Sequence, residues 1–334
     1  MSRPTAHDEL FVHQIPELLP ATVSYDPHWR ESFFFELHDP AAGGGDAVFF
    51  TMAHYPVAQR MDSLQMGRID GAQVLGHRQR PYGDDPHTPA VPGASVEIVK
   101  PFEEIRLRAD PAVCAIGLDL TFRARTQAYG LRRGTIKHGG QTIWDQCHIL
   151  QSGSYHGTYT ANGVARKVDG WLGQRDHSWG VRNHSRCPLW LWFQIQLEDG
   201  FLGVWHWELQ DGSHIYTDGC WAPAGGGEPT PVIAFDKGDV RWVDADGKPA
   251  PYGTNGAGVA GLRGDVAFTL AGGRTIRVAA EGTFARPYEP FHRGGLNLMT
   301  VRTDDGRVGT AIYEVTGALH HRFFPECKAP EPVP

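Results

Sequence analysis

Apolar and polar residues alternate along several short runs of the chain. The clearest run is Leu189–Leu197, where Leu, Phe and Ile occupy every odd-numbered position and Trp and Gln occupy the positions between them. An alternation with a period of two predicts a strand whose two faces differ. Residues 198–200, with the sequence Glu-Asp-Gly, predict a turn, and residues 201–209 then form the returning strand of a hairpin.

Similar runs predict many more strands and almost no helix. Further strands are expected at residues 47–52, 96–100, 103–108, 114–124, 213–217, 232–235, 240–243, 266–270, 275–279, 296–302 and 309–315, and one short helix near residues 8–19. Strands do not alternate with helices, which disfavours Rossmann and TIM-barrel folds. The predicted fold class is therefore all-β, with two barrels or sandwiches of antiparallel strands and little helix.

Glycine and proline strengthen this prediction. The chain has 334 residues, of which 41 are Gly and 24 are Pro. Both residues are poor helix formers, so their abundance excludes a helical bundle. They also interrupt every apolar run before it reaches the ~18 residues of a membrane span. At about 100–200 residues per domain, the length predicts two domains or one large one. The many antiparallel strands favour two, which we place at residues 1–183 and 184–334.

Charge and cysteine content narrow the possible partners. Lys and Arg number 31 against 38 Asp and Glu, a net charge of −7, which disfavours a nucleic-acid partner. The opening sequence MSRPTAHDEL lacks the apolar core of a signal peptide, so we expect a cytoplasmic protein. The five cysteines include no CxxC pair, which disfavours a disulfide framework and a structural zinc site.

Residues 170–182 form the most unusual segment of the chain. Two Trp, two Arg, one Asp and one His lie here between glycines. In an extended strand Arg175, His177 and Trp179 share one face, and Asp176 points to the other. A histidine beside an indole, with an arginine nearby, could present a proton donor in an apolar cavity. The alternative is a structural Asp/Arg network that clamps a barrel.

Residues 204–208 offer a second candidate. His206 and Glu208 share one face of the predicted strand, and Trp205 and Trp207 share the other. A histidine on the inner face of a barrel is a candidate acid or base, because its ordinary pKa lies near neutrality. The alternative is a solvated histidine on the outer face. Tyr216 could support the same site or could belong to an edge strand.

Other kinds of active site have no visible signature. The sequence contains no HExxH motif, and the adjacent His320 and His321 face opposite sides of a strand, so they cannot chelate one metal together. It also lacks a GxSxG nucleophile elbow, a P-loop and a GxGxxG turn that opens a helix. We therefore expect neither a metal nor an organic cofactor.

Two segments resemble a known superfamily. Residues 175–180, Arg-Asp-His-Ser-Trp-Gly, resemble the DHxWG motif of carotenoid 1,2-hydratases, also called hydroxyneurosporene synthases. Residues 28–32, His-Trp-Arg-Glu-Ser, followed by three Phe, are similar to the opening of bacterial relatives. The resemblance implies two lipocalin-like (calycin) β-barrels in tandem, which enclose apolar cavities suited to isoprenoid, steroid or polyketide ligands.

The resemblance also implies chemistry without a cofactor. Activities in the wider group include hydration of a double bond, ring closure as in tocopherol cyclase, and pericyclic cyclisation. His177 and Trp179 match the motif of the hydratases. An Asp on a following strand is thought to protonate the alkene there, and counting along the chain places that position near His206. An imidazole protonates alkenes less well than a carboxylic acid does, which disfavours carotenoid hydration itself and leaves isomerisation, elimination, conjugate addition or cyclisation.

Two functions of different classes remain open. The first, which we favour, is a cofactor-independent lyase, isomerase or cyclase that acts on a hydrophobic small molecule. His177 and His206 would be its acid/base candidates, and Asp176 and Arg175 would orient them. Trp179, Trp205, Trp207 and Tyr216 would bind the substrate. The second is a non-catalytic carrier of a lipid or isoprenoid, which needs the cavity but no proton donor inside it.

The expected independence of metal ions is directly testable. Prolonged chelation should leave both the fold and the activity unchanged, because the sequence contains no close-set metal-ligand motif. Circular dichroism and turnover before and after chelation would check this. Loss of activity that zinc or iron restores would contradict it.

Overall fold

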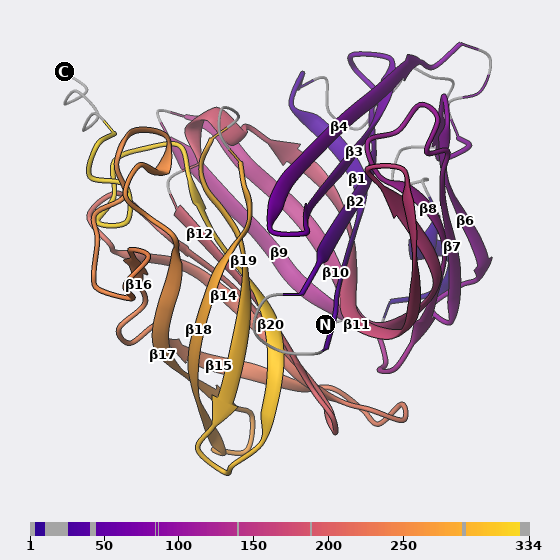
Figure 1. Cartoon of the computed structure of the whole chain (residues 1–334). Coiled ribbons are helices and arrows are strands. Elements are labelled where there is room, and N and C mark those ends of the chain that lie inside the picture. Colours follow the sequence, from indigo (N-terminus) through magenta and orange to yellow (C-terminus); the bar gives the residue numbers. More distant parts are fainter. Residues whose placement is uncertain are drawn as a thin grey trace. The chain divides into compact units, whose positions relative to one another are not determined.

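The computed structural model is an all-β protein, as the sequence predicts (Figure 1). It describes residues 4–10, 26–40, 45–83, 85, 87–138, 140–187, 189–288 and 292–327. Of the short helix expected near residues 8–19, residues 11–19 lie outside these ranges, and Ala6–Glu9 forms a single 3-10 turn, η1. Among the described residues, no helix is long and apolar enough to cross a membrane.

The chain divides into two compact units, with the main break between Arg182 and Asn183. The strands of the first unit are β1 (Trp29–His38), β2 (Ala47–Tyr55), β3 (Arg60–Ile69), β4 (Ala72–Pro81), β5 (Ala90–Val91), β6 (Ala94–Lys100), β7 (Glu104–Ala109), β8 (Gly117–Ala124), β9 (Tyr129–His138), β10 (Gln141–Ala161) and β11 (Val164–Arg182). It remains a prediction that residues 1–183 and 184–334 are domains that fold independently.

The second unit contains the rest of the strands and two short 3-10 turns. These elements are η2 (His184–Arg186), β12 (Leu189–Leu197), β13 (Gly200–Glu208), β14 (His214–Pro223), β15 (Thr230–Asp236), β16 (Arg241–Val243), η3 (Thr254–Gly256), β17 (Gly261–Leu270), β18 (Thr275–Pro287), β19 (Arg293–Thr303) and β20 (Val308–Gly317). The predicted hairpin at residues 189–209 is confirmed as β12 and β13.

The sheet of the first unit curls into a nearly closed barrel. Its strand order is β4-β3-β2-β1-β11-β10-β8-β7-β6-β5, and β9 adds to β10. At the seam between β4 and β5 the side chain of Arg80 bridges the edges. Its Nε donates to Ala90 O at 2.6 Å, and its Nη atoms donate to Tyr82 O at 2.8 Å and Thr88 O at 3.1 Å. The core holds inward residues such as Phe35, Phe50 and Phe122.

The two longest strands, β10 and β11, pair along nearly their whole length. The pattern of residues predicts an extended motif segment but not strands of this length, because glycines interrupt both runs. At Gly173 a Cβ atom would lie 1.9 Å from Glu36 O, so glycine is required there by the close approach of β1. Gly157 and Gly180 meet a backbone oxygen of a neighbouring strand in the same way, so these three glycines mark contact between backbones inside a sheet rather than turns.

Backbone pairing closes the barrel of the second unit. Its strand order is β15-β14-β13-β12-β20-β19-β18-β17-β16, and β15 also pairs with β17, which joins the two ends of the sheet. The inward residues of β12, among them Leu191, Phe193 and Ile195, belong to its core. Every residue of β12 and β13 is buried. The face of β12 that carries Trp and Gln is therefore buried too, although the alternation alone would suggest that it is exposed.

The seam of the first barrel generates a prediction. Arg80→Met keeps the aliphatic stem and removes four charge-assisted hydrogen bonds to carbonyl oxygens, the three above and one to Pro81 O at 3.2 Å, so it should lower the free energy of unfolding by about 2 kcal/mol. Arg106→Met, at an exposed position on β7, is the matched control and should change it little. Urea unfolding of both variants measures the difference. Equal effects would contradict the assignment of Arg80 as the closure of the seam.

Candidate functional site

The two unusual segments of the sequence are neighbouring strands in the first unit. On β1 and β11, Phe33 lies opposite His177, Phe35 opposite Arg175, and Glu31 opposite Trp179. Opposed residues of an antiparallel pair point to the same side. Because Phe33 and Phe35 belong to the core, the side chains of Arg175, His177 and Trp179 also face the inside of the barrel.

These polar residues lie at one mouth of the barrel. Strand β8 ends at Ala124, opposite Gly153 of β10, and β10 and β11 continue beyond that point. Gln151, which pairs with Arg175, donates from Nε2 to Phe102 O in the turn between β6 and β7 and to Thr126 O, both at 2.9 Å. The rim of the barrel thus passes beside Arg175, and His177 lies one layer further out.

A chain of hydrogen bonds runs through buried groups at this mouth. Tyr82 Oη lies 3.0 Å from Nδ1 of His54, and Nε2 of His54 lies 2.8 Å from Oε2 of Glu31. The other carboxyl oxygen, Oε1, lies 2.9 Å from Nε2 of His177, and Nδ1 of His177 lies 2.7 Å from the backbone oxygen of Asp8. The side chains of Glu31 and His177 are fully buried.

Hydrogen-bond chemistry places the protons along this chain. A carbonyl oxygen only accepts, so Nδ1 of His177 carries a proton for Asp8. Burial, reinforced by the neighbouring Glu31, raises the pKa of Tyr82, so its hydroxyl keeps its proton and donates to His54. With His54 donating to Glu31, one further proton lies between Glu31 and His177. That proton makes the pair either acid and imidazole or carboxylate and imidazolium.

Arg175 holds a second buried carboxylate at the same mouth. Its Nη1 and Nη2 donate to Oε1 and Oε2 of Glu9, both at 2.6 Å, and its Nη2 donates to Oε1 of Gln151 at 2.9 Å. The backbone N–H of Phe102 donates to Oε2 of Glu9 at 2.7 Å. A buried arginine–carboxylate pair of this kind is stable because two parallel hydrogen bonds replace the lost water.

Asp176 belongs to a different group of residues. It points away from the barrel interior, where its Oδ1 lies 3.2 Å from Nε2 of His148. Burial lowers the pKa of His148, and Asp176 opposes that effect. Burial and the neighbouring Arg30 lower the pKa of Arg182 to about 9. Because Asp176 contacts His148 on the other face, the carboxyl group in contact with His177 is that of Glu31 and not that of the adjacent Asp176.

His206 faces the inside of the second barrel, opposite Leu191 of β12. Its Nε2 lies 2.9 Å from Oε1 of Glu208, and Nε2 of His321 lies 3.1 Å from Oε2. Lys237 also donates to Oε1. Burial disfavours the ionised form of Glu208, but the hydrogen bonds from His206, His321 and Lys237 outweigh it and hold its pKa well below its usual range.

The predicted substrate-binding aromatics of the second unit lie on the opposite face of β13. Trp205 and Trp207 meet edge to face with ring centroids 4.7 Å apart, and Trp207 stacks on Tyr216 at 4.5 Å. His206 and these three rings are thus separated by the strand itself. The structure brings Arg175, His177 and Trp179 together in one barrel and places His206 inside the other.

Four residues that the sequence analysis did not select complete the mouth of the first barrel: Glu9, Glu31, His54 and Tyr82. Glu31 and His54 had a visible signal, since each continues the apolar face of a strand, Phe33 to Leu37 in one case and Val48 to Met52 in the other. A charged residue on an apolar face needs a buried partner. Glu9 and Tyr82 carried no comparable signal, because contacts distant in sequence place them.

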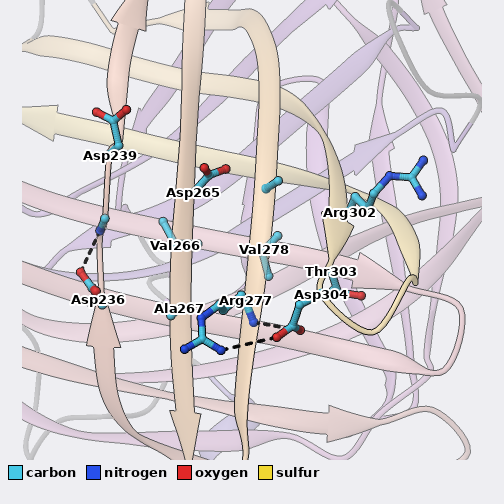
Figure 2. Close-up of a pocket in the computed structure, with 12 residues that line it drawn as sticks. Asp236, Asp239, Asp265, Val266, Ala267, Arg277, Val278, Arg302, Thr303 and Asp304 are labelled. Carbon is cyan, nitrogen blue, oxygen red and sulfur yellow. Dashed lines mark hydrogen bonds and ion pairs between the residues drawn. The ribbon is translucent and has the colours of Figure 1, made fainter.

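The described residues contain no group of His, Cys, Asp and Glu arranged to hold a metal ion. One open concavity of about 480 Å³ lies on the outside of the second barrel, lined by charged residues that include Asp239, Asp265, Arg277 and Arg302 (Figure 2). Arg277 pairs with Asp304, which also lines the concavity (Figure 2). None of the sequence-predicted site residues lines it.

Comparison with known proteins supports the fold. The chain matches a family of unknown function (DUF8625) over residues 5–257. No curated protein matches it significantly. A provisionally named AttH protein from Nitrosomonas europaea is a similar solved structure, with a TM-score of 0.60 and 11% identity over 96% of this chain and 100% of that chain.

Two further structures are similar over most of their length. Kievitone hydratase from Nectria haematococca has a TM-score of 0.55 and 10% identity, covering 95% of this chain and 96% of its own. CghA with Sch210972 has a TM-score of 0.51 and 13% identity, covering 87% and 89%. The fold is therefore the tandem lipocalin-like one that the resemblance to the carotenoid hydratase superfamily implies.

Replacement of the buried glutamate by glutamine is expected to cost less stability in the first barrel than in the second. A carboxamide offers one donor and one acceptor, so it can accept from His54 and donate to a neutral His177, whichever partner carries the proton in the parent protein. Glu31→Gln should therefore lower the free energy of unfolding by less than about 1 kcal/mol. Glu208 accepts from donors at both oxygens, so Glu208→Gln sets an N–H group against a donor and should cost about 1–3 kcal/mol.

Urea unfolding of both variants measures these costs, with Glu31→Ala as the control that removes the partner of two buried histidines. A Glu31→Gln cost as large as that of Glu31→Ala would show that the carboxyl group between His54 and His177 needs its charge.

Proposed function

The chain belongs to the DUF8625 family of unknown function, and we propose that it is a cofactor-independent acid/base enzyme acting on a hydrophobic small molecule. The reaction class is a hydration or elimination, an isomerisation or a cyclisation. The substrate class we propose is an isoprenoid, steroid or polyketide-like compound. The proposed active site is the mouth of the first barrel, and its acid/base pair is Glu31 with His177.

The observation that carries this proposal is the fully buried contact of 2.9 Å between Oε1 of Glu31 and Nε2 of His177, from which we infer a shared proton. A carrier needs an apolar cavity and has no use for a movable proton inside it. Here a carboxyl group links two buried imidazoles, and each is held at its second nitrogen, by Tyr82 in one case and by Asp8 in the other. Such positioning fixes the tautomers, as general acid–base catalysis requires.

The geometry suggests how the pair would work. His177, in contact with the rings of Phe33 at 4.3 Å and Trp179 at 5.4 Å, would deliver the proton to an alkene, enol or leaving hydroxyl. In the carboxylate–imidazolium form of the pair, the proton would leave from Nδ1 of His177 once the Asp8 oxygen has moved away, and the ring would keep the Nε2 proton that it donates to Glu31. Nδ1 would regain a proton from the attacking water or from the substrate carbon that loses one, while His54 and Tyr82 hold Glu31 in place. Trp179, which is only partly buried, would form one wall of the substrate site. No external oxidant or reductant is required.

Similarity of fold supports the proposal without naming the substrate. Kievitone hydratase carries its activity in its name, and CghA has been solved with the small molecule Sch210972. Both show that this tandem-barrel fold serves proteins that act on or hold organic small molecules. The second candidate function is a lipid or isoprenoid carrier, which the aromatic interior of the first barrel would also suit.

The remaining sequence-predicted residues have separate proposed roles. His206 would be an acid/base group inside the second barrel, although its partner Glu208 is ionised and forms an ion pair with Lys237. Asp176 would orient His148 rather than His177. Trp205, Trp207 and Tyr216 are buried on the outer face of β13 and β14, where they would pack against one another rather than bind the substrate. These roles are independent of the chemistry proposed at His177.

The proposal is tested by variants assayed on a substrate found by native mass spectrometry of the protein purified from its own host. His177→Gln and Glu31→Gln should each lower the single-turnover rate by roughly 10²–10⁴-fold, because a positioned acid/base is lost. Ligand affinity should fall much less, since the walls of the site are nearly unchanged. His38→Gln, a buried histidine on the same strand as Glu31, is the control and should keep the parent rate.

Folded His177→Gln and Glu31→Gln proteins that turn over at the parent rate would overturn the proposal. Loss confined to His206→Gln would move the chemistry to the second barrel. A bound ligand that is never converted by the parent protein would favour the carrier.

A further inference from the structure

The mouth of the first barrel is occupied by a segment of the chain itself. The turn η1 lies across it, and its contacts with the barrel are made by Glu9 and by the backbone oxygen of Asp8. Asp8 also closes the turn, because its carboxylate accepts from the backbone N–H and hydroxyl of Thr5 at 2.7 and 2.8 Å. The turn therefore covers Arg175 and His177 together.

The carboxylate of Glu9 sits in a cradle that the barrel builds without it. Arg175 is on β11, Gln151 is on β10, and Phe102 belongs to the turn between β6 and β7. Gln151 accepts from Nε and Nη2 of Arg175 and donates to Phe102 O, so it fixes the guanidinium against the rim. Glu9, by contrast, reaches the cradle from 166 residues away in the sequence.

The cradle has the chemistry of a carboxylate site. It presents three N–H donors to two oxygens, two from the guanidinium and one from the backbone of Phe102. A buried guanidinium needs an anion, and a planar carboxylate fits its fork. The ring of Phe102 lies under Arg175, with its centroid 5.1 Å from Cζ, so the cradle joins apolar surface on one side.

We propose that Glu9 holds the place of a carboxylate on the substrate, and that this protein acts on amphipathic carboxylic acids. The acid would displace η1 and bind Arg175 and the Phe102 N–H through its carboxylate. Its apolar part would lie against Phe33 and Trp179. Displacement of one turn would uncover the anion site and His177 at the same time. The inference rests on the proposed function for the role of His177.

The spacing of the two groups limits the substrate. Arg175 and His177 lie two residues apart on one strand, which separates them by about 6–7 Å. The reacting carbon of the substrate would therefore lie about that distance from its carboxylate, with the apolar remainder beyond it. A substrate without an anionic group would leave η1 in place and gain no access to His177.

A binding experiment with matched probes tests this inference. Dodecanoate and dodecanol share an apolar chain and differ in the anionic group. Glu9→Ala frees the cradle, so it should bind dodecanoate at least about 10-fold more tightly than the parent protein does. Its affinity for dodecanol should stay within about 2-fold. Arg175→Met added to Glu9→Ala should abolish the preference for dodecanoate. Glu97→Ala, at an exposed position of β6, is the matched control and should behave as the parent.

The unmodified protein provides a second readout in case Glu9→Ala does not fold. Saturating dodecanoate should speed hydrogen exchange of the peptide that contains residues 5–10, because the turn is displaced, whereas dodecanol should not. Two results would overturn the inference and leave η1 as a structural plug. One is that Glu9→Ala raises the affinity for dodecanoate and dodecanol equally. The other is that Glu9→Ala leaves the affinity for dodecanoate unchanged and dodecanoate leaves the hydrogen exchange of residues 5–10 unchanged.

Neither readout uses turnover, so the two proposals fail separately. A carboxylate preference in a protein that never turns over a bound acid would overturn the enzyme and keep the carboxylate site. Turnover that depends on His177, without a carboxylate preference, would overturn the present inference alone.

Discussion

A carboxyl group inside a β-barrel is stable only where hydrogen-bond partners replace the water it has lost. The two units of this protein meet that requirement by different arrangements of hydrogen-bond partners. In the first barrel Glu31 lies between His54 and His177, with a proton to share. In the second, Glu208 accepts from His206, His321 and Lys237 and stays ionised. The same pair of residue types thus gives the proposed proton-transfer pair in one barrel and an ion-pair network in the other.

The pairing of β1 with β11 creates the first of these arrangements. It aligns ten residues of each strand and sets Glu31 and His177 on one inner face. The motif that resembles the carotenoid hydratases supplies the histidine, and the weaker opening motif supplies the carboxyl group. The two resemblances are therefore halves of one structural feature. Trp179 and Phe33 complete it by placing two aromatic rings in contact with the imidazole.

The sequence predicts the fold class and the faces of the motif strands, because period-two alternation and the abundance of glycine are local properties. It predicts that Arg175, His177 and Trp179 share a face and that Asp176 does not. It does not predict the partners of those side chains. Glu9 meets Arg175 across 166 residues, and Tyr82 meets His54 across 28, so only the folded barrel brings them together. The strands β10 and β11 are missed for the same reason, since their glycines reflect contact with other strands.

The most direct test of the account is the state of the proton between Glu31 and His177. Nuclear magnetic resonance of protein labelled with ¹⁵N in histidine, assigned with His177→Gln, reports which ring nitrogens carry protons. The account predicts slowly exchanging protons on Nδ1 of His177, bonded to Asp8, and in the bond between Nε2 and Glu31, the latter shifted strongly downfield. A His177 ring with no proton on Nδ1, or with both protons exchanging at the rate of a solvated histidine, would contradict it.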